Sequence, residues 1–429
     1  MSVPDGFKVS EVGVIPVDWD VKRLGDIADV KTGPFGSSLH EKDYVDDGTP
    51  IITVEHLSDK GVVHKNLPMV SDYDKNRLSS YILKTGDIVF SRVGSVDRNS
   101  LIRDLEDGWL FSSRLLRIRI NNKNIAPAYL SYHFLQESTK QRIRSVAVGQ
   151  TMASLNTAIL KGIEITLPPL AEQKAIAQSL SDVDNLITAI DKLITKKRNI
   201  KQGTMQELLT GKKRLSGFTG EWDVKKLGEL GYSNRPTIKA GPFGSSLKKE
   251  FYVKKGYKIY GQEQVIAGDL SIGNYYIDFD LFEKLKSCEI RPNDILISLV
   301  GTFGKVMVVP DNIERGIINP RLIRLSLNAN LVYSYFLQYW LISSDTQKLL
   351  SETSHGGTMG IINAKVLSGL NIPLPPLPEQ KVIAKILTEM DEEIEALEKK
   401  REKYKNIKQG MMQQLLTGKT RLKINLEDR

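Results

Sequence analysis

The chain has 429 residues, of which 41% are hydrophobic and 26% charged, as is typical of a globular protein. Its formal net charge of +9 is compatible with a polyanionic partner but does not require one. The single cysteine, Cys288, excludes an internal disulfide framework and indicates a reducing, cytoplasmic compartment. The first 20 residues contain no apolar core, so we expect no signal peptide, and no apolar run reaches membrane-spanning length.

Taken in chain order, the sequence repeats itself after about 207 residues. Residues 19–25 return as residues 222–228 with one conservative change, and residues 33–39 return unchanged as residues 241–247. Further matches continue to the end of each repeat, which indicates tandem duplication of one domain plus one helix. The segments 40–80 and 248–288 share little. This divergence suggests two sites of one kind that recognise different targets, although drift on an unused surface would look similar.

The first part of each repeat consists mainly of short β-branched or alternating runs, which predict strands. Two further stretches, 129–141 and 333–350, predict helices. We therefore expect two α+β domains, each with a curved sheet or barrel. The predicted strands are 51–54, 87–90 and 115–120 in the first repeat and 295–300, 305–309 and 322–325 in the second.

The most regular stretch also occurs twice, at residues 167–212 and 374–419. Each copy opens with prolines and Glu-Gln-Lys and closes with Leu-Leu-Thr-Gly-Lys, which predicts a helix of about forty residues, roughly 60 Å long. Apolar residues inside each copy step by four and three, which is the seam of a coiled coil. The equal lengths favour pairing of the two helices with each other, whereas the alternative is two unrelated helices that each lie on their own domain. The seam residues are Ile176, Leu180, Val183, Ile187, Ile190 and Ile194 in the first helix and Ile383, Leu387, Met390, Ile394 and Leu397 in the second.

We find no signature of catalysis in the sequence. Residues 301–305 do not have the spacing of a phosphate-binding loop, and no dinucleotide-binding or amino-methyltransferase motif is present. The five histidines are dispersed without metal-ligand spacing. These observations predict a recognition protein without an active site.

The paired arrangement of a variable domain, a proline-rich start, Glu-Gln-Lys, a long helix and Leu-Leu-Thr-Gly-Lys resembles the specificity subunits of type I restriction–modification systems over essentially the whole chain. The resemblance implies target recognition domains at 1–166 and 216–373, each reading one half of a bipartite double-stranded DNA sequence. It implies spacer helices within 167–215 and 374–429, packed antiparallel, that fix the gap between the half-sites. Two methyltransferase subunits and a motor-nuclease subunit would bind S-adenosylmethionine, ATP and Mg²⁺, and this chain would bind no cofactor.

Candidate DNA contacts follow from the chemistry of base edges and phosphates. We select basic residues at strand ends or in turns, and we favour Arg114 and Arg321 because both repeats place arginine before an apolar strand. The alternative for each basic residue is a solvated surface charge that does not contact DNA. The candidates are Ser37, Ser38, Arg92, Arg98, Arg114, Gln150, Thr151, Ser245, Ser246, Lys305, Arg321 and Thr358.

The serines belong to the repeated segment 33–39 and its copy, which would hold phosphate through backbone N–H groups and hydroxyls. The alternative is a scaffold turn with Phe35 and Phe243 anchored in the core. Residues 149–151 and 356–358 likewise form either a close approach to the DNA backbone or a structural loop.

Two other features of the long helices have competing interpretations. The basic runs 196–198 and 399–401 are most simply solvated helix faces, and the helix ends 206–212 and 413–419 are either docking surfaces for two identical methyltransferase subunits or helix-end core. Two other classes of function remain as alternatives: a stand-alone DNA-modifying enzyme, and a coiled-coil scaffold that binds no nucleic acid. Only DNA binding predicts a steep dependence of affinity on salt.

Overall fold

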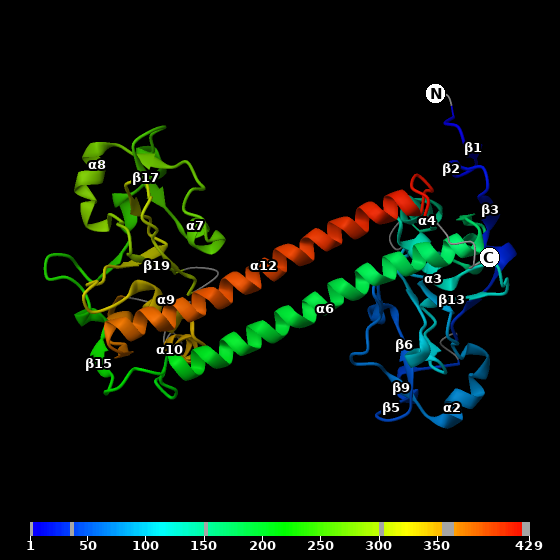
Figure 1. Cartoon of the computed structure of the whole chain (residues 1–429), viewed down its shortest axis with the longest axis horizontal. Coiled ribbons are helices and arrows are strands. Elements are labelled where there is room, and N and C mark those ends of the chain that lie inside the picture. The colour runs from blue at the N-terminus through cyan, green and yellow to red at the C-terminus, as the bar shows by residue number, and fades with distance from the viewer. Residues whose placement is uncertain (1–2, 35–37, 150–152, 300–303, 354–363, 423–429) are drawn as a thin grey trace. The chain divides into compact units, whose positions relative to one another are not determined.

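The computed structural model describes residues 3–34, 38–149, 153–299, 304–353 and 364–422, and it divides into two compact units (Figure 1). Unit 1 comprises Met1–Asp191 with Lys399–Arg429, and unit 2 comprises Lys192–Glu398. Each unit contains one globular part together with half of each long helix, α6 (Leu170–Leu208) and α12 (Leu377–Leu415). The predicted α+β class, the duplicated domain and the two long helices are confirmed.

Among its described residues, the globular part of unit 1 contains two four-stranded sheets and three strand pairs. The first sheet is antiparallel, and the second includes one parallel pair. The first sheet has the order β11 (Asn99–Leu101), β10 (Ile88–Ser91), β13 (Leu115–Ile120), β4 (Ala28–Thr32). The second has the order β12 (Leu110–Phe111), β6 (Thr49–Ile52), β9 (Met69–Val70), β5 (Tyr44–Val45). The pairs are β1 (Phe7–Ser10) with β2 (Gly13–Pro16), β3 (Asp20–Arg23) with β14 (Glu164–Leu167), and β7 (Leu57–Ser58) with β8 (Gly61–Val62).

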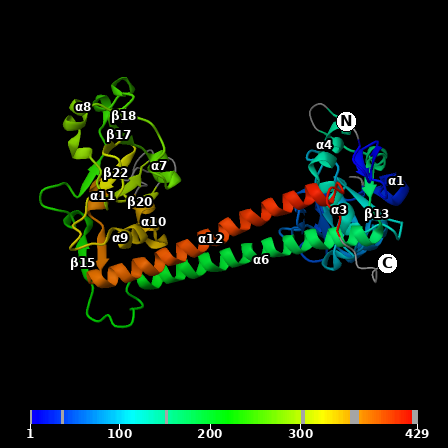
Figure 2. The ribbon, with the colours of Figure 1, turned by 45° about the horizontal axis from the view of Figure 1, so that its top comes forward.

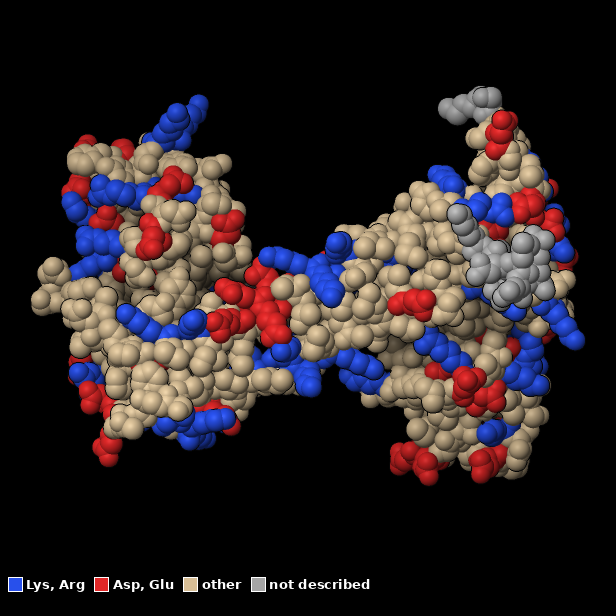
Figure 3. Space-filling model, viewed as in Figure 1, with Lys and Arg blue, Asp and Glu red and all other residues tan. Residues whose placement is uncertain are grey.

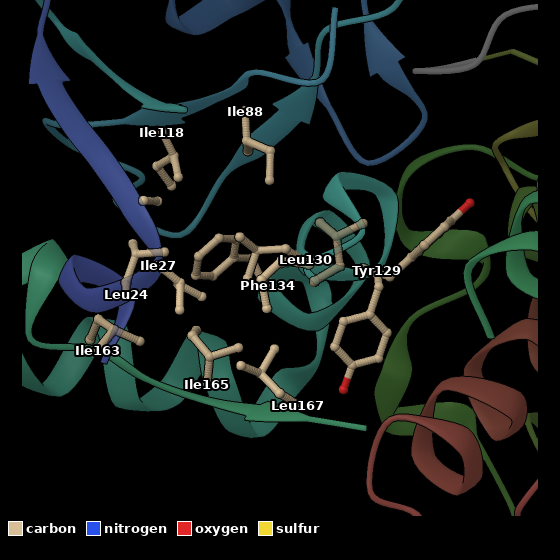
Figure 4. Packing of buried hydrophobic residues seen from close by; sticks show 14 of the residues in the cluster. Leu24, Ile27, Ile88, Ile118, Tyr129, Leu130, Phe134, Ile163, Ile165 and Leu167 are labelled. Carbon is tan, nitrogen blue, oxygen red and sulfur yellow. The ribbon is translucent and has the colours of Figure 1, made fainter. Parts of the chain in front are cut away.

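The main core of unit 1 lies between the first sheet and the helices that cover it. Ile88 and Ile118 from the sheet face Leu130 and Phe134 of α3 (Pro127–Leu135), and this cluster continues to Ile165 on β14 (Figure 4). All five side chains are fully buried, so each stabilises the fold by about 1.5–3 kcal/mol. The helices of this unit are α1 (Leu24–Ile27), α2 (Asp72–Arg77), α3 (Pro127–Leu135), α4 (Glu137–Val146) and α5 (Thr157–Lys161).

Unit 2 repeats the plan, with fewer strands in the part of it that the structure describes. Its antiparallel sheet has the order β16 (Ile238–Ala240), β22 (Leu322–Leu325), β19 (Ile295–Ser298), β20 (Val306–Val308). A three-stranded sheet has the order β18 (Tyr276–Ile277), β17 (Tyr257–Tyr260), β21 (Gly316–Ile318), and β15 (Asp223–Lys226) pairs with β23 (Asn371–Leu374). The helices are α7 (Gln262–Ala267), α8 (Phe279–Lys284), α9 (Ser334–Ile342), α10 (Ser344–Thr353) and α11 (Ala364–Ser368).

The structure differs from the sequence prediction in the middle helices, because each predicted helix is broken into two. Gln136 separates α3 from α4 and Ser343 separates α9 from α10, and both residues have extended backbone. The Ser343 hydroxyl accepts a hydrogen bond from the Thr346 N–H, so it caps α10. The apolar pattern continues across the break, which is why periodicity alone missed it.

The long helices run antiparallel within each unit (Figure 2). Near the N-terminal end of each long helix, the seam residues also pack against the globular part of the unit. Ile176 and Leu180 belong to the core of unit 1, and Ile383 and Leu387 belong to the core of unit 2. Further along, Ile187, Ile190, Ile194 and Ile394 are buried, whereas Val183, Met390 and Leu397 are partly buried. The seam therefore pairs the helices and also anchors each globular part to them.

Cross-helix ion pairs add to the seam. Lys197 and Arg198 on α6 pair with Glu393 and Glu398 on α12 within unit 2, and Arg401 pairs with Asp191 within unit 1. The basic runs therefore contribute to helix pairing as well as to the solvated face. Such partly exposed pairs are worth about 0–1 kcal/mol each.

The Glu-Gln pair that opens each long helix ties the helix to its own unit. The Gln173 Oε1 atom accepts a hydrogen bond from the Ala126 N–H (2.9 Å), and Gln380 does the same for Tyr333 (2.8 Å), at the start of α3 and α9 respectively. The Glu172 carboxylate binds Arg421, just beyond the end of α12. The sequence repeat therefore reflects a repeated structural joint.

Candidate nucleic-acid interface

Three candidate segments of unit 1 meet at one edge of its antiparallel sheet. The Arg92 N–H donates to the Arg114 carbonyl (2.9 Å), and the Gly33 N–H donates to the carbonyl of Leu115 (3.1 Å). Leu155 joins them, because its N–H donates to the Arg92 carbonyl (2.8 Å). Segments far apart in the sequence thus form one continuous rim.

Unit 2 builds the same edge from equivalent strands. The Gly241 N–H donates to the Leu322 carbonyl (3.0 Å), and the Leu299 N–H donates to the Arg321 carbonyl (3.0 Å). Lys305 lies beside them, because its backbone exchanges hydrogen bonds with Ser298 at the end of β19. The two units therefore present related rims with arginine at the same register position.

The arginines at these rims have different surroundings. Arg114 and Arg321 are exposed, and their guanidinium groups have no partner among the described residues. The ammonium group of Lys305 is likewise exposed and has no partner among them. Arg92 donates to the Ser113 carbonyl (3.3 Å), and Arg98 donates to the Leu57 carbonyl on β7. Arg114 and Arg321 are thus available to a ligand, whereas Arg98 supports the protein backbone.

Both copies of the repeated turn begin with a buried glycine, and in the second copy Phe243, Ser245 and Ser246 are exposed. A Cβ atom on Gly33 would lie 2.1 Å from the Ser112 carbonyl oxygen, and one on Gly241 would lie 1.9 Å from that of Asn319. These glycines are therefore required by packing, as the scaffold alternative expects. Phe243, however, is 68% exposed, so its predicted anchoring in the core is wrong. In this copy of the turn the side chains buried in the core are those of Pro242 and Leu247 instead.

The remaining turn and loop candidates divide into two groups. Ser245 and Ser246 are exposed, and Ser38 is half-buried with its carbonyl accepting a hydrogen bond from Arg77 (2.7 Å). The others lie outside the described residues: Phe35, Ser37, Gln150, Thr151 and Thr358.

A buried arginine lies on a central strand next to each rim and forms hydrogen bonds within the fold. The sequence analysis did not identify this role. Arg117 binds Asp29 (2.8 Å), and Arg324 donates to the carbonyls of Ser287 (3.0 Å) and Glu289 (2.8 Å). Burial lowers the pKa of Arg324 to about 10 and raises the pKa of the neighbouring Asp294 above its ordinary value. The signal was available, because each arginine stands three residues after the exposed one in both repeats.

Two equivalent cavities lie beside the long helices. In unit 2 a cavity of about 880 Å³ is lined by Leu209, Thr210 and Trp340, and in unit 1 a cavity of about 470 Å³ is lined by the equivalent Leu416, Thr417 and His133. The smaller cavity is also lined by Val12, Val14 and Ile15 from the β1–β2 hairpin. The Leu pairs at the two helix ends are buried in the cores of their units, as the helix-end core alternative expects, although Leu209 and Leu416 also line these cavities.

Within the described residues no group of His, Cys, Asp and Glu is arranged to hold a metal ion. None of the helices that the structure describes is long and apolar enough to cross a membrane. Cys288 is buried, at 2% exposure.

Comparison with known proteins identifies the class to which this fold and its paired rims belong. Residues 16–202 and 219–406 each match the type I restriction modification DNA specificity domain. The chain is therefore a member of the type I restriction–modification DNA specificity family, with two copies of the family's domain.

Individual relatives agree with this assignment. The chain is 33% identical to the putative type I restriction enzyme MjaX specificity subunit of Methanocaldococcus jannaschii, over 98% of this chain and 97% of that protein. It is 28% identical to the MjaVIII specificity subunit of the same organism over equal shares. The fold is similar to the crystal structure of a type I S subunit from M. genitalium (TM-score 0.57, 15% identity), over 97% of this chain and 98% of that one.

Proposed function

We propose that this chain is the DNA-recognition subunit of a type I restriction–modification complex and reads a bipartite target, with one half-site for each unit. The observation that carries this proposal is the recurrence of an unpaired arginine, Arg114 or Arg321, at the same rim position in both units. Arginine is the side chain that most often reads guanine in the major groove. The helices α6 and α12 would fix the gap between the half-sites.

The chemistry of the complex would belong to other subunits. We assign no catalytic residue and no cofactor to this chain, and we expect S-adenosylmethionine, ATP and Mg²⁺ to bind the methyltransferase and nuclease subunits. Two identical methyltransferase subunits need two equivalent docking surfaces, and the cavities beside Leu209 and Leu416 occupy equivalent places. Their mixed apolar and polar lining suits a protein partner.

The two arginines give a test of half-site assignment. Replacing Arg114 with Ala should weaken discrimination at one base of one half-site by about 1–3 kcal/mol, because a bidentate contact to guanine is lost. Arg321→Ala should do the same at the other half-site only. The measurement is binding of the complex to duplexes that carry single base changes. Arg98→Ala is the matched control, and a uniform loss of affinity in the Arg114 and Arg321 variants would show phosphate contact instead.

The function as a whole is tested by single-molecule methylome sequencing of the host, with and without this gene and with its methyltransferase partner present. We expect loss of adenine methylation at one split motif, which would identify both half-sites. Methylation that is unchanged, while the purified complex shows no salt-dependent affinity for DNA, would contradict the proposal.

A further inference from the structure

The two units carry one loop that has the same backbone but different side chains. We call residues 40–49 tip loop 1 and residues 248–257 tip loop 2. Each starts with a one-turn 3-10 helix, Glu41–Asp43 or Lys249–Phe251, and each ends where a strand begins that pairs in parallel with a neighbour. A Cβ atom on Gly48 or on Gly256 would lie 2.2 Å from a facing carbonyl oxygen. The loops are therefore structural equivalents.

Their charges are opposite. Tip loop 1 contains four acidic residues and one lysine, a net charge of −3, and tip loop 2 contains four lysines and one glutamate, a net charge of +3. Figure 3 shows basic side chains at the tip of unit 2, over β17, and acidic side chains at the tip of unit 1, near β5 and α2. Because the backbones correspond, the difference lies in the side chains that each loop presents to its surroundings.

The lysines of tip loop 2 are not used within the fold. Lys248, Lys249, Lys254 and Lys255 are all exposed, and none of their side chains has a hydrogen bond or ion pair with another described residue. Adjacent like charges repel one another, and a bound polyanion relieves that repulsion. Lysine also suits a phosphate lattice, because its ammonium group acts as a mobile point charge.

Tip loop 2 lies close to the proposed reading rim of unit 2. Strand β17 leads from the loop to Tyr260, whose carbonyl accepts a hydrogen bond from the N–H of Asn319 (2.8 Å), two residues before Arg321. The five residue steps from Lys255 to Tyr260 span about 16 Å at the rise of a strand. Successive phosphates of one DNA strand are about 3.4 Å apart along the axis. A duplex held at Arg321 therefore needs only about five base-pair steps to reach the lysines.

We propose that tip loop 2 binds the phosphate backbone of the DNA beside the half-site of unit 2, and that the acidic tip loop 1 makes no such contact. This inference rests on the proposed function. Its consequence is an asymmetric specificity subunit: the two units read bases through equivalent rims, but one of them holds the flanking backbone more strongly. Backbone contacts add affinity for every sequence and carry no base specificity.

The experiment compares the full chain, assembled with its methyltransferase partner, with the double variant Lys254→Gln/Lys255→Gln. The probes are a duplex that carries the methylated motif and a random duplex of equal length, each titrated between 50 and 200 mM salt. Each lost phosphate contact lowers the salt slope by about 0.9, so the slope should fall by up to about two. The ratio of the affinity of the unaltered protein to that of the variant should fall about tenfold across this range for both probes. The ratio between the affinities for the two probes should stay unchanged.

Lys225→Gln/Lys226→Gln is the matched control, because it removes another adjacent lysine pair of unit 2, on β15, away from the tip. It should leave the slope unchanged. Asp46→Lys/Asp47→Lys should give tip loop 1 the missing contact and raise the slope. An unchanged slope in the Lys254/Lys255 variant, or loss of subunit assembly instead of DNA affinity, would overturn the inference. Absence of salt-dependent binding by the unaltered complex would instead overturn the proposed function.

Discussion

Arg214→Ala should lower the free energy of unfolding of unit 2 by about 3–5 kcal/mol, because it leaves a buried carboxylate without a partner. Arg214 binds both oxygens of Glu379 (2.8 Å each), and the Glu379 side chain is 1% exposed. Arg214 follows the glycine that ends α6, and Glu379 lies in the first turn of α12. The pair therefore joins the end of one long helix to the start of the other, and hydrogen exchange of core amides in unit 2 would measure its contribution.

The equivalent pair in unit 1 provides the comparison. Glu172 accepts hydrogen bonds from Arg421 (2.6 and 2.8 Å), but it also accepts one from the indole N–H of Trp19 (3.2 Å). We therefore expect Arg421→Ala to cost less in unit 1 than Arg214→Ala costs in unit 2. Replacing Arg214 and Glu379 together with methionine should restore most of the loss, since no charge is then left buried. Equal losses in the two single variants would contradict this account.

The second large effect concerns pH. Burial, with a smaller contribution from the charge of Arg142, lowers the pKa of His133 from 6.5 to about 3. The folded state therefore binds a proton less readily than the unfolded state between these values, so stability falls as the pH falls below about 6.5. At pH 5 the loss from this one group is about 2 kcal/mol relative to pH 8, as measured by hydrogen exchange of core amides in unit 1.

His133→Phe removes the titrating group and keeps an aromatic ring of similar size. The variant should lose less stability between pH 8 and pH 5 than the unaltered chain does, by about 2 kcal/mol. Unit 2 carries Trp340 at the equivalent place, lining the equivalent cavity, so its stability should not show this contribution. The same pH dependence in the Phe variant would show that other groups are responsible.

The sequence was sufficient to predict the features that depend on repetition and periodicity. The two long helices, the α+β class and the strands Leu115–Ile120 and Leu322–Leu325 follow from apolar spacing and from the recurrence of each segment. The sequence also indicated Arg114 and Arg321 as an equivalent pair. These are local or self-similar features, so no knowledge of tertiary contacts was needed.

What the sequence could not predict depends on contacts between distant residues. Arg214 and Glu379 are 165 residues apart, and nothing in the local pattern of either indicates the other. Nothing in the sequence distinguishes Arg98 from the other surface arginines, because its contact with β7 forms only in the folded chain. The break at Ser343 depends on one extended residue inside an apolar pattern that continues on both sides. The exposure of Phe243 likewise depends on which neighbours fill the core.

The division of the chain into units has a consequence for its synthesis on the ribosome. Unit 2 is a single continuous segment, Lys192–Glu398, whereas unit 1 needs both the first 191 residues and the segment from Lys399 onward. Domains generally fold as units while the chain emerges, so unit 2 becomes complete before unit 1 does. The unit whose synthesis begins first is thus the last to fold completely, and a product that stops near residue 398 would contain a complete unit 2 and a unit 1 that lacks its part of α12.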